Sequence, residues 1–411
     1  MSTPAQAGLA LVVDGWFDGE ERHSGPTTFT VVNGQISDIS PGDHSAALAA
    51  RGLTVQRGAF LLPGLVDAHV HLFLDGAPTE QAARSAHLKQ PLEQLVEAAR
   101  ASARQSLALG ITQVRDAGDR HGINNRIRTE AQAPGSNLTS VRSTGLGIKR
   151  AKRYGAFMAT DVDDAQSIRD SIQSLAVSND EIKLILTGII DFDAGAVTDE
   201  PQFTLDEARV VVDAARTNGR NTMVHCSGPK GLAIAAAAGV GSIEHGFFMS
   251  RDTLALMAQN QVAWTPTFCP VHFQWAQPQA VGWKPETVGN LRRILDQHAQ
   301  HLLVARELGV PLLLGTDAGS MGVEHGYAVF DEIDRYLEAG LSLQDTLRAA
   351  TSANRRHFGH THTTLRPGAP WDAVLLAQNP FEHIRALRQP LQVWRATSPT
   401  EEPPPHDGPN H

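Results

Sequence analysis

The spacing of apolar residues divides the chain into segments of two kinds. Residues 8–58 contain short apolar runs separated by turn residues, which is typical of a β-meander. One such run, 10–13, leads to the predicted turn residues Asp14 and Gly15. Farther along, Asn33 and Gly34 separate two apolar stretches, and this dipeptide favours a type I′ hairpin because it tolerates positive φ at both positions. We therefore expect residues 8–58 to form short strands joined by turns.

From residue 60 to about residue 358, candidate strands alternate with amphipathic helices, a pattern that predicts a parallel sheet. The predicted strands are 61–67, 111–115, 138–143, 182–186, 222–225, 242–245, 262–267 and 310–315. The clearest predicted helices are 92–109, 205–217, 252–260, 291–308 and 343–350. Eight strands with helices between them is the count of a (β/α)8 TIM barrel, which carries its chemistry at the C-terminal ends of the strands.

Strand-like segments return near the end of the chain, at 373–376 and 391–394. We expect these segments to pair with the N-terminal strands in one small composite β-sandwich domain beside the barrel. The predicted fold class is therefore α/β. The predicted bounds are 1–59 with 360–396 for the small β domain, 60–359 for the barrel, and 397–411 for a proline-rich, acidic tail that we expect to be disordered.

Length and composition limit the classes of protein that fit this pattern. The 411 residues accommodate one barrel of roughly 250 residues and a smaller unit. A net charge of −9 disfavours nucleic acid as a partner, and no apolar run approaches the ~18 residues of a membrane span. Two cysteines, Cys226 and Cys269, give no disulfide framework. We expect a cytoplasmic enzyme with a small-molecule substrate and no nucleic-acid or membrane partner; composition leaves homo-oligomer formation open.

Two histidines, His69 and His71, follow the first predicted barrel strand. Residues i and i+2 of a strand point to the same side, so both imidazoles would aim at one place. Imidazole nitrogens suit zinc or a similar divalent metal. A His-x-His pair by itself is more often a solvated pair in a loop, and the remaining strands decide between these two interpretations.

Further polar residues accompany the later predicted strands. Lys183 lies among apolar residues of the fourth strand, His225 and His245 end the fifth and sixth, and Asp317 follows the eighth. Each of these residues alone could be structural, and a buried lysine needs a carboxylate partner or a path to solvent. Because they fall at the same end of successive strands, together they favour a metal site.

The order of these residues resembles that of the amidohydrolase superfamily with a two-metal centre, in its prolidase-like and imidazolonepropionase-like branches. The surrounding segments PGLVDAHVH, GITQVRDAG, SIEHG and GTDAG are similar to that family as well. The resemblance covers nearly the whole chain, and it is specific for the superfamily but not for a substrate. It implies that CO2 carbamylates Lys183 and that this carbamate bridges the two metals.

The resemblance also implies how the residues would share two divalent ions, with zinc as the expected element. One ion would be held by His69, His71 and Asp317, the other by His225 and His245, with Lys183 between them. Two such ions lower the pKa of a bridging water, and the resulting hydroxide would attack a substrate carbonyl. Asp317 is the expected general base and acid. The predicted activity is hydrolysis of an amide, peptide-like or cyclic amide C–N bond.

Three alternatives stay open from the sequence. The same residues could serve a metal-dependent deaminase, or a hydrolase of an ester, lactone or phosphotriester, because hydroxide attacks all of these groups. Lys183 disfavours the deaminases, which commonly use one metal and lack this lysine. A non-catalytic scaffold relative is the remote alternative, since such proteins usually lose several metal ligands and none is missing here.

Four residues are candidates for substrate binding, each with a structural alternative. Arg115 ends the second strand and could orient substrate or form an ion pair. Tyr154 lies in a basic loop after the third strand that could receive a substrate carboxylate. His272 and His325 lie in predicted loops at the catalytic face. Beyond His225 and Cys226 the chain has Ser227-Gly-Pro-Lys230, a departure from many prolidase-like relatives that puts dipeptide specificity in doubt.

Two other features are interpreted as structural. His360 and His362 form a second His-x-His pair, but no apolar strand precedes it, so we expect surface histidines. Cys226 adjoins His225, and strand alternation turns its side chain to the opposite face, so we expect a thiol buried in the core.

Overall fold

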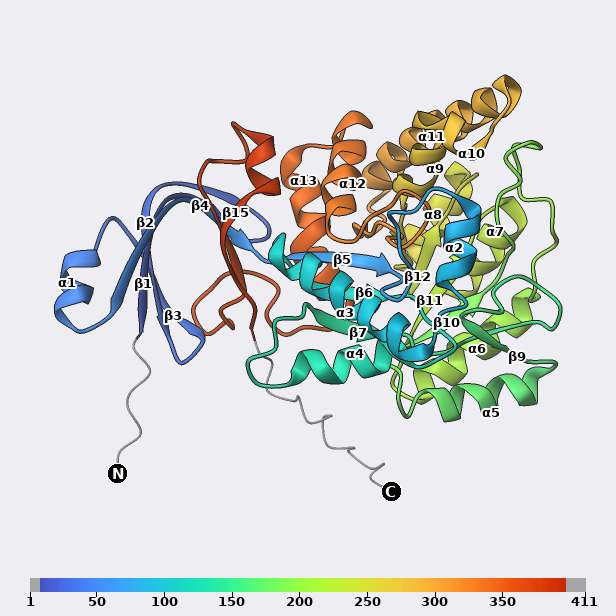
Figure 1. The fold of residues 1–411 in the computed structure, drawn as a ribbon, viewed down its shortest axis with the longest axis horizontal. Coiled ribbons are helices and arrows are strands. Elements are labelled where there is room, and N and C mark those ends of the chain that lie inside the picture. Colours follow the sequence, from blue (N-terminus) through green and yellow to red (C-terminus); the bar gives the residue numbers. More distant parts are fainter. Residues whose placement is uncertain (1–7, 397–411) are drawn as a thin grey trace.

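The computed structural model describes residues 8–396 of the chain (Figure 1). A sheet of long strands stands at one end of the molecule, and parallel strands surrounded by helices form the larger part at the other end (Figure 1). The architecture is α/β, as expected. The predicted tail 397–411 lies outside the described residues.

The sheet at the narrow end joins strands from both ends of the chain. Its order is β15-β14-β4-β1-β2-β3, so the two C-terminal strands lie at the edge next to β4. These six strands form one sheet, in place of the two facing sheets that a sandwich would need. The bounds are β1 Leu9–Phe17, β2 Arg22–Val32, β3 Gln35–Pro41, β4 Thr54–Pro63, β14 Ala373–Leu376 and β15 Pro390–Trp394, with helix α1 at Ser45–Ala50.

The two turn predictions in this sheet have opposite outcomes. The hairpin between β2 and β3 is confirmed, because Asn33 and Gly34 have φ of 52° and 73°. The turn predicted at Asp14 and Gly15 is wrong. Strand β1 runs through these residues, and only its register against β2 shifts there, which is a bulge.

The parallel strands of the larger part form two sheets. One has the order β13-β12-β11-β10-β8-β9 and the other β5-β6-β7. Their bounds are β5 Leu65–Val70, β6 Ile111–Asp116, β7 Ser140–Ser143, β8 Gly147–Lys149, β9 Ala159–Asp161, β10 Glu181–Ile185, β11 Asn221–Cys226, β12 Ser242–His245 and β13 Ala263–Thr265. These sheets are consistent with a barrel, but the described strands do not close into one hydrogen-bonded ring.

The gap between β13 and β5 is filled by the segment 310–318, where a strand was predicted. Isolated parallel bridges join Leu312 to Trp264 and Ala318 to Val70, but no continuous ladder forms. Pro311 has no N–H to donate. The carbonyl of Leu314 accepts a bond from the Asn354 side chain, 2.9 Å away, as well as one from Ala68. The segment therefore lies where the eighth strand was expected, without regular strand pairing.

Helices surround the parallel strands. The helices that precede strand β13 in the chain are α2 Gln81–His87, α3 Leu92–Ala108, α4 Ile123–Gln132, α5 Ala165–Leu175, α6 Leu205–Thr217, α7 Pro229–Ala238 and α8 Arg251–Gln259. The later ones are α9 Phe268–Ala276, α10 Pro278–Val281, α11 Pro285–Leu308, α12 Tyr327–Glu338, α13 Leu343–Arg348 and α14 Asn354–His357. Along the described chain, no helix combines the length and apolar character needed to cross a membrane.

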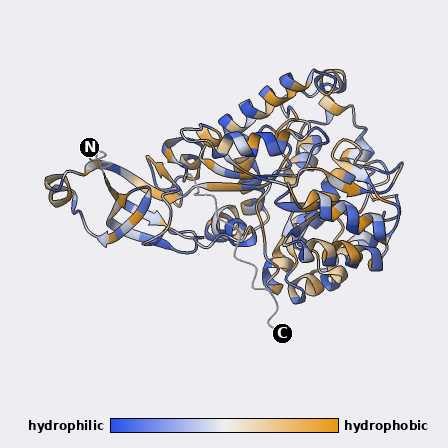
Figure 2. Cartoon of the chain, turned by 90° about the horizontal axis from the view of Figure 1, so that it is seen from below, coloured by the Kyte–Doolittle hydropathy of each residue, from blue (hydrophilic) through white to orange (hydrophobic). Residues whose placement is uncertain are grey.

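Amphipathic sequence explains how these helices attach to the strands. Figure 2 shows hydrophilic and hydrophobic residues sharing the same helices, so that one side of a helix can face the sheet and the other solvent. In α6, for example, Ala208, Val211, Val212 and Ala215 are buried, at the spacing of one helical face. The largest apolar cluster runs through these helix faces and the strands β5, β10, β11 and β12. This core fixes the strand ends that carry the polar residues.

Candidate metal centre

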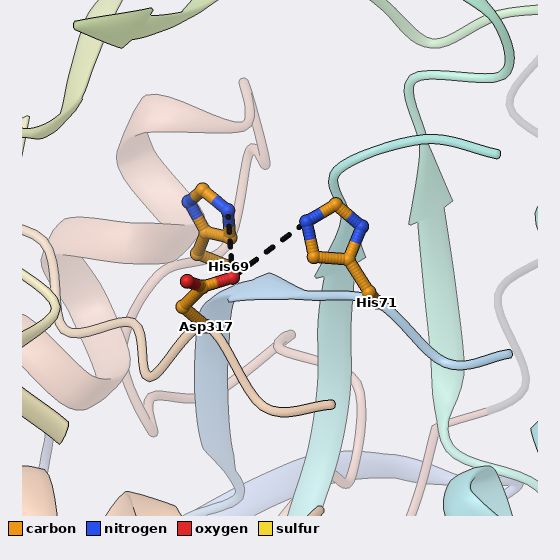
Figure 3. A group of neighbouring side chains, drawn as sticks. All are labelled: His69, His71 and Asp317. Atoms are coloured by element: carbon orange, nitrogen blue, oxygen red, sulfur yellow. Dashed lines mark ion pairs between the residues drawn. The ribbon is translucent and has the colours of Figure 1, made fainter. Parts of the chain in front are cut away.

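The end of strand β5 directs two imidazoles toward Asp317, near the end of segment 310–318. The Nε2 atoms of His69 and His71 lie 3.5 and 3.6 Å from Oδ1 of Asp317 (Figure 3). Asp317 has a positive φ of 58°, and its backbone N–H donates to the carbonyl of His69 over 2.7 Å. This bond and the turn hold the carboxylate opposite the two rings.

The geometry and protonation of this group fit a divalent metal. The ligand atoms of His69, His71 and Asp317 all lie within 4.8 Å of one another, while the Nε2 to oxygen distances exceed those of hydrogen bonds. The other ring nitrogens are already bound, His69 Nδ1 to Glu244 Oε2 at 2.8 Å and His71 Nδ1 to the Gly118 carbonyl at 3.3 Å. Burial lowers the pKa of both imidazoles, so they stay neutral, as metal ligands must.

A second pair of histidines lies beside the first group. His225 ends β11 and His245 ends β12, and His225 Nδ1 is 2.9 Å from His245 Nε2. The ring of His245 is also 5.0 Å from the ring of His69, measured between centroids. Burial lowers the pKa of His225 to about 3 and that of His245 well below its usual value. Nδ1 of His245 is oriented by the Thr267 hydroxyl, 2.8 Å away.

Lys183 approaches the same place from strand β10. Its side chain is 1% exposed, and burial lowers its pKa to about 8. Burial also raises the pKa of Asp317, to about 7. One cavity of about 220 Å³, named here the central cavity, is lined by all six predicted ligands: His69, His71, Lys183, His225, His245 and Asp317. The structure thus brings together the six residues that were predicted as ligands from their positions near the strand ends.

Arg115 lies beneath the central cavity and does not line it. Its guanidinium is fully buried, 3.0 Å from Glu181 and 2.9 Å from Glu244, and it donates to the Ala68 carbonyl over 2.7 Å. Glu244 therefore links Arg115 to His69 and orients that ring. The structure favours the ion-pair alternative for Arg115 over substrate contact.

Sequence analysis missed Glu244 as a positioning residue. It is fully buried on strand β12, and strand alternation places it on the face opposite to its neighbour His245. Strand β12 has the sequence Ser-Ile-Glu-His, and an acidic residue within a predicted buried strand is a signal that could have been used, since buried acidic residues are almost always paired.

The other candidates for substrate binding divide in the same way. Tyr154 lines the central cavity, with its ring 5.2 Å from that of His225. His272 belongs to helix α9, bonds Arg335 and lines a different cavity. His325 is buried, and its Nε2 lies 3.1 Å from the Leu74 carbonyl outside the central cavity. Of the four candidates, Tyr154 is the one that faces the site.

The two features interpreted as structural stay outside the site. Cys226 is fully buried in the apolar core, as expected. His360 is half-buried rather than exposed, and its Nε2 lies 3.0 Å from the side-chain oxygen of Gln113. His362 lies near Arg366, and neither histidine lines the central cavity.

The chain is similar to proteins of known sequence and of known structure. An uncharacterised protein of Mycobacterium tuberculosis is 28% identical over 86% of this chain and 88% of its own length. The ochratoxinase of Aspergillus niger is 22% identical over 83% of this chain and 76% of its own length. The crystal structure of a Xaa-Pro dipeptidase with bound methionine superposes with a TM-score of 0.80, at 23% identity, over 95% of this chain and 99% of that one.

The structural likeness alone shows the fold, since its sequence identity is low. The family model described as the amidohydrolase family matches residues 60–400. That match spans the parallel strands, the predicted ligands and the last strands, and it shows that this chain belongs to the amidohydrolase family.

Proposed function

We propose that this protein is a metal-dependent hydrolase that cleaves an amide, peptide-like or cyclic amide C–N bond. The observation that carries the proposal is the convergence of six side chains of ligand type on one cavity, with two imidazole nitrogens facing a carboxylate. When bound there, two divalent ions, with zinc as the expected element, would supply an activated water and polarise the substrate carbonyl.

The proposed ligands divide into two groups around Lys183. His69, His71 and Asp317 would hold one ion, because their ligand atoms already face one another. His225 and His245 would hold the other. Burial that lowers the pKa of Lys183 to about 8 favours the neutral amine. That amine can add to CO2 and lose a proton, which gives the carbamate proposed to bridge both groups.

Asp317 is proposed to move the proton. Burial raises the pKa of its carboxyl, so the group can both take and return a proton near neutral pH. The Ser320 hydroxyl donates to Oδ2 over 3.0 Å, which leaves Oδ1 toward the two histidines. The proton goes from the attacking water to Asp317 and then to the leaving nitrogen.

Metal analysis of the purified protein and of Lys183→Ala tests the proposal. We expect close to two divalent ions per chain in the wild type and clearly fewer in the variant, because the group between the two histidine pairs is lost. Lys149→Ala is the matched control: it removes a buried lysine of β8 that pairs with Asp161 and does not line the central cavity. This control should keep its metal.

Each outcome has a definite meaning. One ion or none in the wild type would contradict the two-metal site, and unchanged metal content in Lys183→Ala would make the lysine structural. A screen of dipeptides, N-acyl amino acids and cyclic amides then identifies the bond. The proposal is wrong if none of the amides is hydrolysed. Turnover of esters, lactones or phosphotriesters would then favour a hydrolase of those groups, and release of ammonia from an aminated ring would favour a deaminase.

A further inference from the structure

The walls of the central cavity beyond the predicted ligands are apolar. They are formed largely by aliphatic and aromatic side chains, among them Leu74, Phe157, Met158, Ile190, Phe192 and Val271. An apolar cavity of about 150 Å³ is large enough for benzene. The central cavity, with about 220 Å³, therefore has room for one ring or branched alkyl group beside a reacting amide.

A substrate carboxylate would find no second cation in these walls. Within residues 8–396, Lys183 is the one lysine or arginine that lines the central cavity, and it belongs to the proposed metal centre. Arg84, whose charge acts on Asp317, donates to the carbonyls of Gly319 and Asp75 over 2.9 and 2.8 Å. It thus stays behind the backbone of the loop that carries Asp317.

Three of the four cations of the basic loop after the third predicted strand are bound elsewhere, and the fourth, Lys152, is exposed and does not line the central cavity. Lys149 pairs with Asp161, and Arg150 pairs with Glu207, both at 2.5 Å. Arg153 bonds the Glu200 carbonyl. The loop therefore does not present a charge to the central cavity, although its Tyr154 does line it.

The polar side chains of the walls beyond the proposed ligands carry no charge; they are Tyr154, Ser227, Thr267, Gln274 and Ser320. Oε1 of Gln274 accepts a bond from the Trp283 indole at 3.2 Å, and the Ser227 hydroxyl accepts one from the Phe247 backbone at 3.3 Å. Burying a carboxylate against such walls leaves the charge unpaired, which is strongly unfavourable. Burying an uncharged ring or alkyl group there is favourable.

We propose, on the basis of the proposed function, that the central cavity selects uncharged amides with an apolar aromatic or branched group. Substrates with a free carboxylate beside the hydrolysed bond, such as dipeptides and N-acyl amino acids, are disfavoured. The aromatic rings of Phe157 and Phe192 supply the contact surface for the apolar group.

Matched pairs of compounds test this selectivity on the metal-loaded protein. One pair is 4′-methylacetanilide and 4-acetamidobenzoate, which differ by a methyl group against a carboxylate. The other is N-benzoylphenylalanine dimethylamide and N-benzoylphenylalanine. We expect kcat/KM to favour the neutral member of a hydrolysed pair by about 100-fold, mainly through KM. Equal or better turnover of the acidic members would overturn the inference.

Calorimetric titration of the same pairs separates this inference from the proposed function. If no compound is hydrolysed but the neutral members bind at least tenfold more tightly, the proposed function loses support and the selectivity stands. If the acidic members bind as tightly, the selectivity is refuted whether or not hydrolysis occurs.

A variant with an added cation gives an independent check. Ile190 is a half-buried wall residue, so Ile190→Arg can place a guanidinium in the central cavity. We expect the preference for the neutral member to fall at least tenfold, with metal content unchanged. Val177→Arg is the control, since Val177 is 85% exposed and outside the cavity, and its preference should match the wild type. If Ile190→Arg does not fold, Gln274→Lys replaces it, and an unchanged preference in the folded variant contradicts the inference.

Discussion

Asp317 combines two duties that a single substitution can separate. As a ligand it needs one oxygen directed at His69 and His71, and as a general base it needs a carboxyl that accepts a proton. Asp317→Asn keeps the oxygen and loses the proton acceptor. We expect metal content near that of the wild type and turnover lower by about 10²–10⁴-fold, as is usual when a general base is removed.

The control for this prediction is Asp213→Asn, which changes a carboxylate that is 74% exposed on helix α6. It should leave both metal content and turnover unchanged. Retained turnover in Asp317→Asn would refute its role as base, and loss of metal would show that coordination alone explains the defect.

Arg115 is expected to matter for stability more than for chemistry. Arg115→Met leaves Glu244 buried without its arginine partner, whereas Glu181 keeps Arg142, and removal of one partner from a buried ion pair costs about 3–5 kcal/mol. His69 would also lose part of the support for its orientation through Glu244. Denaturant unfolding measures the first effect and metal titration the second.

Arg126→Met is the comparison for this prediction, because Arg126 pairs with Glu93 at the surface, where ion pairs contribute little. It should unfold at nearly the wild-type denaturant concentration. Equal losses of unfolding free energy in the two variants would mean that the buried ion pairs around Arg115 contribute no more to stability than a surface ion pair.

The residues of the site differ in how far the sequence could predict them. His69, His71, His225 and His245 could be placed because strand alternation and strand ends define their direction. Arg115 could not, since every residue of β6 except Gln113 is buried, and a buried strand does not show which face leads to the cavity. Glu244 was missed because its role depends on Arg115 of another strand, 129 positions away in sequence.

At the scale of elements, helix α6 offers the clearest test of a local signal. Thr204 and Glu207 form a capping box at its start: Glu207 N–H donates to the Thr204 hydroxyl over 3.3 Å, and Thr204 N–H donates to the Glu207 carboxylate over 2.9 Å. Thr204→Ala removes this cap and should lower the free energy of unfolding by about 1 kcal/mol.

Thr129→Ala is a suitable control, because the Thr129 hydroxyl bonds only the Asn125 carbonyl of its own helix, in the middle of exposed surface. Its effect should be smaller than that of Thr204→Ala in the same thermal or chemical unfolding assay. If the two substitutions lower the free energy of unfolding equally, the cap adds nothing beyond ordinary helix propensity.

The bounds of α6 were predicted to the residue, whereas the strand predicted at 310–315 is not present as a regular strand. A helix with a capping box and an apolar face contains its own boundary signals. The segment 310–315 is apolar enough for a strand, but its pairing depends on Asn354 and Ala349 near the end of the barrel region, which bond the Leu314 backbone. Sequence periodicity carries no information about such distant partners.

At the scale of the molecule, the two parts are joined where β4 continues into β5. A Cβ on Gly64 would lie 2.1 Å from Thr112 Oγ1 and 2.3 Å from Asp372 Oδ1, so only glycine allows this close packing. Asp372 in turn accepts a bond from Arg355 over 2.8 Å. The sequence predicted that the last strands join the first ones, but the single sheet and this packing required the structure.

The buried histidines give the whole molecule a predictable sensitivity to acid, and His298 is the one to test because it lies outside the predicted ligands. It is 1% exposed, its ring stacks 3.9 Å from that of Phe247, and its Nε2 lies 3.0 Å from the Pro266 carbonyl. Burial lowers its pKa to about 3. Between the usual histidine pKa of about 6.5 and a pH of about 3, His298 therefore binds a proton in the unfolded chain but not in the folded chain.

Stability should consequently fall as the pH drops from about 6.5 toward 3, and His298 alone contributes roughly 2 kcal/mol between pH 7 and pH 5. His298→Gln should reduce the pH dependence of the free energy of unfolding by this amount, although the variant is less stable at pH 7 because it loses the ring contacts. Denaturant unfolding at both pH values measures the difference. His383→Gln, at an exposed position, should keep the wild-type dependence. The same pH dependence in His298→Gln as in the wild type would show that the ring is protonated inside the folded protein.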